Sequence, residues 1–277
     1  MKITSITDYT TLNNGIQIPW LGFGVFKVPD GREVEQAVKW AIEAGYRSID
    51  TAAIYGNERG VGNAIRKSGV PRNEIFLTTK VWNEDMRKKR TTDAFKESLE
   101  RLETDYVDLY LIHWPVKGCY QDAWKALEDI YASGQTRAIG VSNFLVHHLE
   151  DLLAHSTIVP AVNQVEFHPY LVQPDLMKFC QKQHIQLESW SPLMRGKILT
   201  MAEITQLAEK YHKTPAQIVL RWDLQHGVVT IPKSVHKDRI IENARVFDFE
   251  LSAADMMLLD QLDRGERTGA DPDNFDF

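Results

Sequence analysis

The sequence predicts a (β/α)8 TIM barrel with an N-terminal β-hairpin and an extra C-terminal helix. Eight short apolar runs alternate with amphipathic helical stretches along the chain. Strands that alternate with helices form a parallel sheet, and eight such units favour a closed barrel over an open sheet. The length of 277 residues is ordinary for one barrel, and no linker or low-complexity tract interrupts the alternation. We therefore expect residues 1–277 to form a single domain.

The predicted elements follow in order from the N-terminus. Residues 9–12 and 16–18 flank Asn13-Asn14-Gly15, in which the Asn-Gly pair tolerates the positive φ of a hairpin turn. Asp30 to Glu33 resembles a capping box that starts the first helix, and Gly45 stands just past the end of that helix. The predicted strands are residues 21–24, 47–50, 75–81, 107–112, 137–141, 161–165, 186–189 and 228–231.

A glycine-rich segment at residues 60–65 begins like a dinucleotide-binding fingerprint. It falls inside a predicted helix, however, whereas the fingerprint needs a strand-to-helix turn. We interpret Gly60 and Gly62 as packing glycines.

Composition limits the classes of function. A net charge of −6 argues against general nucleic-acid affinity, so an anion site needs a local basic cluster. Cys119 and Cys180 are far apart and form no C-x-x-C pair, which suits a reducing cytoplasm and gives no support for a disulfide or structural zinc. The start has no apolar signal core, and no run approaches a membrane span. We expect a soluble cytoplasmic protein without a membrane or nucleic-acid partner.

The histidines do not suggest a metal site. They include His147, His148, His155 and His168, and none of them has carboxylates at ligand spacing in the sequence. We expect no bound metal.

Four titratable residues fall at or just after the ends of three predicted strands: Asp50, Tyr55, Lys80 and His113. In a parallel barrel such side chains converge at one mouth, where barrel enzymes keep their chemistry. This set favours proton transfer. Taken singly, each residue also has a structural interpretation, such as an ion pair of Asp50 and Lys80 at the barrel rim.

Other groups at strand ends suit a nucleotide and a substrate. Ser142, Asn143, Gln164 and Trp190 offer a hydroxyl, two amides and an indole face, as a flat heterocycle with a carboxamide requires. Lys233 and Ser234, with Arg239 near a predicted helix start, suit an extra phosphate. Residues that could wall an apolar substrate pocket are Phe26, Trp82 and Trp114.

Three long motifs resemble the signatures of the aldo-keto reductase family. They are GYRSIDTA at 45–52 with YGNE at 55–58 and Val61-Gly62, AIGVSNF at 138–144, and IPKS at 231–234 with Arg239 and Asn243. The likeness runs from the hairpin to the DPDNF tail at 271–275, and the short tail is similar to the bacterial branch with glyoxal, methylglyoxal and 2,5-diketo-D-gluconate reductases.

The resemblance implies an NADPH-dependent reductase of aldehydes and ketones. Tyr55 would be the general acid, its pKa lowered from about 10 toward neutrality by the Lys80 ammonium. Asp50 would keep Lys80 protonated, and neutral His113 would orient the substrate oxygen. The implied NADPH contacts are Gly24, Val25, Phe26, Ser142, Asn143, Gln164, Trp190, Ser191, Pro192, Leu193, Ile231, Lys233, Ser234, Val235, Arg239, Glu242 and Asn243. The implied substrate contacts are Phe26, Trp82, His113 and Trp114.

The expected activity is therefore NADPH-dependent reduction of small carbonyls, including methylglyoxal-like dicarbonyls, by a cytoplasmic monomer. Two alternatives stay open. One is a barrel lyase or aldolase in which Lys80 forms a Schiff base. The other is an NADPH-binding sensor subunit without turnover.

Overall fold

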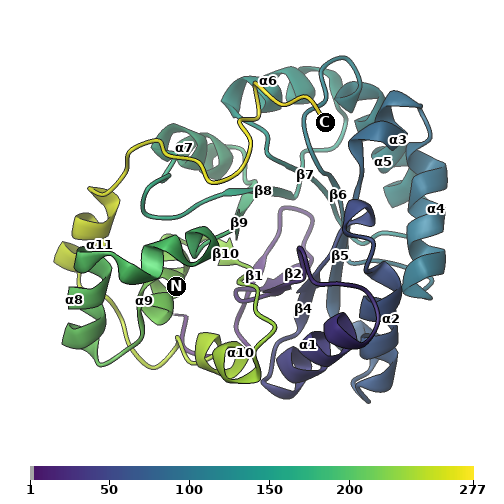
Figure 1. The fold of residues 1–277 in the computed structure, drawn as a ribbon. Coiled ribbons are helices and arrows are strands. Elements are labelled where there is room, and N and C mark those ends of the chain that lie inside the picture. The colour runs from purple at the N-terminus through teal and green to yellow at the C-terminus, as the bar shows by residue number, and fades with distance from the viewer. Residues whose placement is uncertain (1–2) are drawn as a thin grey trace.

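The computed structural model describes residues 3–277, so the predicted polar start at Met1 and Lys2 lies outside the described residues. Eight parallel strands form one sheet in the order β10-β9-β8-β7-β6-β5-β4-β3 (Figure 1). A parallel bridge between Leu21 and Thr230 joins its two edges. The strands are β3 (Phe23–Gly24), β4 (Ser48–Asp50), β5 (Phe76–Val81), β6 (Leu109–Ile112), β7 (Ile139–Ser142), β8 (Val162–Glu166), β9 (Gln186–Trp190) and β10 (Val229–Thr230).

Helices surround the barrel, as Figure 1 shows. They are α1 (Arg32–Glu43), α2 (Glu58–Lys67), α3 (Asn83–Arg87), α4 (Thr91–Leu102), α5 (Tyr120–Ala132), α6 (Val146–His155), α7 (Pro174–Lys182), α8 (Ala202–Tyr211), α9 (Pro215–Gln225), α10 (Lys237–Asn243) and α11 (Ala253–Asp260). Short 3₁₀ helices are η1 (Ala53–Tyr55), η2 (Arg72–Glu74) and η3 (Met194–Thr200). The predicted (β/α)8 barrel and its extra C-terminal helix, α11, are confirmed.

The predicted hairpin is also confirmed. β1 (Tyr9–Thr11) pairs antiparallel with β2 (Gln17–Pro19), and Gly15 takes a φ of 85° in the turn between them. The Asn13 side chain donates to Pro160 O, and the Asn14 side chain donates to Arg137 O. Both acceptors precede barrel strands, so the hairpin lies at the amino ends of the strands, opposite the mouth.

The predicted capping box at Asp30 is wrong. Helix α1 begins at Arg32, its N-cap is Gly31, and no side chain caps it. Asp30 Oδ1 instead accepts a hydrogen bond of 2.8 Å from Gly60 N. The Asp30 carboxylate therefore caps a backbone N–H in the first turn of α2 and not one in α1.

Gly60 and Gly62 lie inside α2, and the packing interpretation is confirmed. A Cβ on Gly60 would approach Val34 Cγ1 to 2.3 Å, and one on Gly62 would approach Leu102 O to 2.1 Å. Because Leu102 O is a backbone atom at the end of α4, the contact at Gly62 cannot be relieved by a change of rotamer.

We expect Gly62→Ala to lower the free energy of unfolding by about 1–3 kcal/mol, because the methyl group forces α2 and α4 apart. Urea unfolding followed by circular dichroism measures the change. Arg59→Ala, on the exposed face of the same helix, is the control and should change stability little. Equal stability of the two variants would show that α2 and α4 do not pack this closely.

The C-terminal tail crosses the mouth side of the barrel after α11. Figure 1 shows the yellow segment running from α11 past α7 toward α6. Thr268 N and Gly269 N donate to the Glu166 carboxylate at 2.7 and 3.1 Å, which ties the tail to the end of β8. Within residues 3–277, no helix is both long and apolar enough to span a membrane.

Candidate active site

A buried ion pair lies at the centre of the mouth. Asp50 ends β4, and Lys80 lies on the neighbouring β5. Lys80 Nζ donates to Asp50 Oδ1 at 2.7 Å, to Asp50 Oδ2 at 2.8 Å and to Thr51 O at 2.9 Å. Both side chains are almost fully buried. All three ammonium protons have acceptors, so the charge of Lys80 is fixed in position.

Tyr55 and His113 lie beside this pair. The Tyr55 ring, at the end of η1, has its centroid 5.2 Å from Lys80 Nζ. The His113 ring, directly after β6, lies edge-on to Tyr55 with centroids 5.6 Å apart. The structure thus brings together the four residues that the sequence placed at the mouth.

Burial and charge set the protonation of the cluster. Burial opposes the charge of Lys80, but Asp50 and Tyr55 more than offset this, so the pKa of Lys80 is raised. Burial and the Lys80 charge hold the pKa of His113 well below its usual value. Lys80 is therefore a cation and His113 a neutral imidazole near neutral pH.

The predicted lowering of the pKa of Tyr55 toward neutrality is wrong. Burial raises this pKa to about 12, and the Lys80 charge offsets only part of the effect. Tyr55 therefore keeps its proton across the physiological range. It remains a potential proton donor, with Lys80 close enough to stabilise the phenolate formed once the proton leaves.

Polar side chains from the ends of β7 and β9 are bonded to one another near His113. Ser142 Oγ donates to Gln164 O at 2.7 Å, and Asn143 Nδ2 donates to His113 O at 2.9 Å. Trp190 Nε1 donates to Asn143 Oδ1 at 2.9 Å. Asn143 takes a φ of 65°, a left-handed conformation that asparagine tolerates better than most residues.

Sequence reasoning missed Glu188, a buried carboxyl group next to Gln164. Gln164 Nε2 donates to Asp50 Oδ2 at 2.8 Å and to Glu188 Oε2 at 2.7 Å. Glu188 is fully buried on β9. The signal was present, because a glutamate in the middle of an otherwise buried strand is unusual without a partner.

The predicted phosphate residues gather near β10 and α10. Lys233 and Arg239 are exposed, and within the described part of the chain neither has an ion-pair partner. Ser234 Oγ accepts from His236 N at 3.1 Å. Glu242 accepts from Thr214 Oγ1 at 2.8 Å, so its carboxylate already has a protein donor.

Most of the other predicted cofactor residues lie at or just after the ends of β3, β9 and β10. A Cβ on Gly24 would lie 3.0 Å from Ile231 O, so β3 and the end of β10 meet closely there. Among the remaining predicted contacts, Val25, Pro192, Ile231 and Asn243 are buried, and Ser191, Leu193 and Val235 are partly buried.

Aromatic rings stand around His113 and Tyr55. The ring centroids of Trp82 and His113 are 5.3 Å apart, and those of Phe26 and Tyr55 are 5.0 Å apart. Phe26 is 49% exposed, so a ligand at the mouth could contact its ring, whereas Trp114 is buried. The apolar wall of a substrate pocket stays a prediction.

The tail adds two aromatic rings that sequence reasoning did not assign to the site. Phe277 stacks on Trp82 with centroids 5.7 Å apart and planes at 5°, and it meets Trp114 edge-on at 5.2 Å. Phe275 lies 5.2 Å from Trp114. Nothing in the sequence specifies these contacts, because they depend on where the tail folds back.

The expectation that the histidines form no set with carboxylates at ligand spacing is wrong in one place, where His147 and His148 meet Asp273. His147 Nε2 lies 2.9 Å and His148 Nε2 lies 3.4 Å from Oδ1 of Asp273 on the tail. His148 Nδ1 also accepts from Leu145 N, which leaves the ring proton of the neutral imidazole on Nε2. A metal needs a bare nitrogen at that position, so we interpret the cluster as a hydrogen-bonded attachment of the tail to α6.

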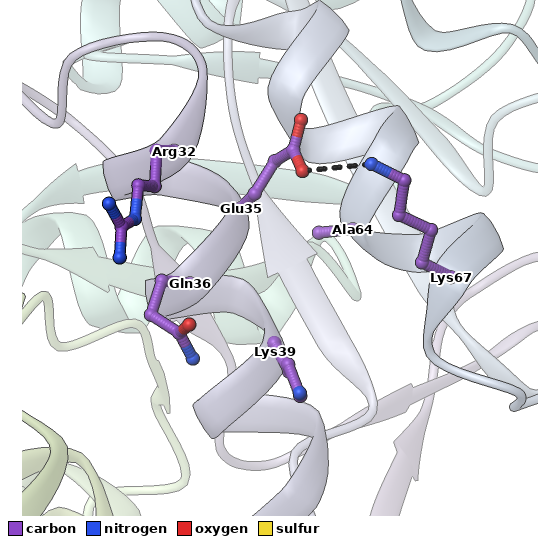
Figure 2. A pocket seen from close by; sticks show the side chains of 6 residues that line it. All are labelled: Arg32, Glu35, Gln36, Lys39, Ala64 and Lys67. Carbon is purple, nitrogen blue, oxygen red and sulfur yellow. Dashed lines mark hydrogen bonds and ion pairs between the residues drawn. The ribbon is translucent and has the colours of Figure 1, made fainter.

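Two hollows lie away from the mouth. One, of about 300 Å³, lies between α1 and α2 and is lined mostly by charged side chains, with Lys67 Nζ 3.1 Å from Glu35 Oε2 (Figure 2). The other, of about 540 Å³, is lined by residues of the hairpin and of α7 through β9, including Leu12, His184 and Gln186. Neither contains the titratable cluster, so neither is the candidate active site.

The barrel and the cluster at its mouth define a TIM-barrel enzyme with titratable groups at the carboxyl ends of its strands. A model of the aldo/keto reductase family matches residues 20–264. Glyoxal reductase of Bacillus subtilis (strain 168) is 60% identical over 99% of both chains. Methylglyoxal reductase DkgA of Escherichia coli (strain K12) is 46% identical over 95% of this chain and 96% of the relative.

Solved structures agree with this likeness. A crystal structure of a Gox0644 mutant in complex with NADPH matches with a TM-score of 0.92 and 43% identity, over 98% of this chain and 99% of that one. The chain belongs to the aldo/keto reductase family, and it is an oxidoreductase.

Proposed function

We propose that the protein is an NADPH-dependent reductase that converts small aldehydes and ketones to alcohols, with Tyr55 as the general acid. The observation that carries the proposal is the Lys80 ammonium, held by Asp50 beside the Tyr55 ring and next to neutral His113. Reduction of a carbonyl needs a hydride at carbon and a proton at oxygen, and this cluster is suited to deliver the proton.

The proton moves from the Tyr55 hydroxyl to the oxygen of the substrate as that oxygen gains negative charge. The raised pKa keeps Tyr55 protonated until then. Lys80 stabilises the phenolate that remains, and Asp50 prevents Lys80 from swinging away. His113, being neutral, donates one hydrogen bond to the same substrate oxygen and orients it.

The bound nicotinamide would supply the hydride. Gln164 fits its carboxamide, because both N–H groups of Gln164 are used inside the barrel and Oε1 has no donor among residues 3–277. Ser142 and Asn143 would complete that contact, and Trp190 would cover the ring. The other residues proposed to contact the nucleotide are Gly24, Val25, Phe26, Ser191, Pro192, Leu193, Ile231, Val235, Glu242 and Asn243.

The extra phosphate of NADPH would be held by Lys233, Ser234 and Arg239. Removing both cations should weaken NADPH far more than NADH, since only NADPH carries the 2′-phosphate. Each charge-assisted contact contributes about 1.5–3 kcal/mol, so Lys233→Ala/Arg239→Ala should raise the NADPH Kd by about 100-fold or more. Fluorescence titration with both cofactors measures it.

Lys237→Ala, on the same helix as Arg239, is the control for a general loss of positive charge. Equal weakening of NADPH and NADH in the double variant would contradict the assignment of the 2′-phosphate to these side chains.

The proposed substrates are small carbonyls, among them dicarbonyls like methylglyoxal. The glyoxal and methylglyoxal reductase relatives support this choice, as does the wall of Phe26, Trp82, Trp114 and Phe277. A panel of glyoxal, methylglyoxal, benzaldehydes, sugar aldehydes and dicarbonyl acids, assayed by loss of NADPH absorbance, tests it. Absence of reduction across the panel would contradict the proposed function.

We also propose one domain over residues 1–277 and a cytoplasmic monomer. The continuous barrel and the two free cysteines support this. Size-exclusion chromatography with light scattering tests the monomer.

A further inference from the structure

Glu188 is a buried acid that the proposed proton transfer does not use. It is the middle residue of β9, it is fully buried, and its register partner on β8 is Gln164. Its Oε2 accepts from Gln164 Nε2, and its Oε1 is buried without a hydrogen-bond partner within residues 3–277. Burying a carboxyl group with an unpaired oxygen costs free energy, so its presence here calls for a physical explanation.

The contacts of Glu188 fix the direction of the Gln164 amide. A primary amide has two N–H donors on nitrogen and one acceptor oxygen. Gln164 directs both donors inward, to Asp50 and to Glu188. Asp50 is an acceptor here, because Lys80 donates to both of its oxygens. The amide oxygen of Gln164 is therefore the group left for a ligand at the mouth.

The charges of the cluster balance only if Glu188 holds a proton. Lys80 is the single cation among the groups that act on Glu188, and Asp50 already neutralises it. A second buried carboxylate would have no counter-charge. Burial, and after it the charge of Asp50, raise the pKa of Glu188 to about 8. Oε1, which accepts no hydrogen bond within residues 3–277, is available to carry the proton.

A negative charge on Glu188 would act on Tyr55 electrostatically, without direct contact. The ionisable groups around the acid are Asp50 from β4 and Lys80 from β5, with Tyr55 from η1 beyond them. A negative charge on Glu188 raises the pKa of Tyr55 and makes it a weaker proton donor. The pKa of Tyr55 itself is about 12. A loss of activity near pH 8, the pKa of Glu188, would therefore not come from deprotonation of Tyr55.

We propose that Glu188 is a positioning residue that directs the Gln164 amide toward the nicotinamide carboxamide, and that its loss of a proton switches reduction down at alkaline pH. This inference rests on the proposed reductase function. It assigns a role to an acid outside the predicted catalytic set.

Glu188→Gln separates charge from hydrogen bonding, because its amide oxygen can still accept from Gln164 but cannot ionise. In the wild type, kcat/KM for methylglyoxal should fall more than about threefold between about pH 7 and pH 9. In Glu188→Gln this fall should disappear or move up by at least about one pH unit. Asp223→Asn is the control and should keep the wild-type profile. Asp223 is another buried carboxyl group, bonded to Thr230, and it is not among the main charges that act on Tyr55.

Glu188→Leu removes the acceptor as well. The Gln164 amide then keeps only its hydrogen bond to Asp50 and is held less firmly. The NADPH Kd should therefore rise at least about fivefold, whereas Glu188→Gln should keep it near the wild-type value. An unchanged pH profile in Glu188→Gln, or equal NADPH affinity in the Leu and Gln variants, would overturn the inference.

Infrared spectroscopy tests the proton without any turnover. The difference between wild type and Glu188→Gln near neutral pH should contain the band of a protonated carboxyl group, and this band should vanish at alkaline pH. A carboxylate band already present near neutral pH would overturn the inference even if the enzyme reduces carbonyls. The opposite result is also distinguishable. If Glu188 holds a proton and Glu188→Leu weakens NADPH, but the wild type reduces no carbonyl, only the proposed function is contradicted.

Discussion

Tyr55→Phe is expected to lower kcat by about 10²–10⁴-fold, the usual contribution of a general acid, while the NADPH Kd stays the same. The change removes one hydroxyl and keeps the ring that packs against Phe26 and His113. Without that hydroxyl the proposed proton donor beside Lys80 is absent. Steady-state kinetics with methylglyoxal and fluorescence titration with NADPH measure the two quantities.

Tyr9→Phe is the matched control, because Tyr9 is 44% exposed on the hairpin at the other end of the barrel. It should leave kcat unchanged. If Tyr55→Phe also turned over at the wild-type rate, the proton would have to come from His113 or water, and the role proposed for Lys80 would lose its basis.

Local patterns predicted the barrel well. The alternation of apolar runs and amphipathic stretches predicts the strand order, because each strand of a parallel barrel pairs with the next one in the chain. The misplaced cap at Asp30 shows the limit. The motif Asp-x-x-Glu is compatible with a cap, but the carboxylate is taken by Gly60 on a neighbouring helix, which only the packed structure brings close.

The site divides in the same way. Asp50, Lys80 and His113 were predictable because strand ends of a barrel meet at one mouth. The contacts of Phe277 were not, since a tail after the last helix has no period that fixes its path. The pKa of Tyr55 was also beyond the sequence, because burial and the Lys80 charge act in opposite directions and their balance depends on depth.

The same geometry weighs against a Schiff-base aldolase. A lysine that attacks a carbonyl must be neutral, and enzymes achieve this with a lowered pKa. The pKa of Lys80 is raised, and its three protons are held by Asp50 and Thr51. We therefore expect no borohydride-trapped adduct at Lys80.

Lys80→Met is expected to lower the free energy of unfolding by about 3–5 kcal/mol, because it leaves the Asp50 carboxylate buried without its counter-charge. It should also remove most turnover, since the phenolate of Tyr55 would lose the charge that stabilises it. Lys39→Met is the control: the Lys39–Glu43 pair is exposed and 3.8 Å long, and such pairs contribute about 0.5 kcal/mol or less. Urea unfolding and kcat measure both effects.

The double variant Asp50→Asn/Lys80→Met separates stability from catalysis. Two neutral side chains leave no buried charge, so most of the lost stability should return, and the amide oxygen that replaces the Asp50 carboxylate can still accept from Gln164. Turnover should not return, because the cation beside Tyr55 is still absent. Recovery of both would mean that the pair only holds the barrel together. Recovery of stability alone would show that the charge of Lys80 acts on the reaction.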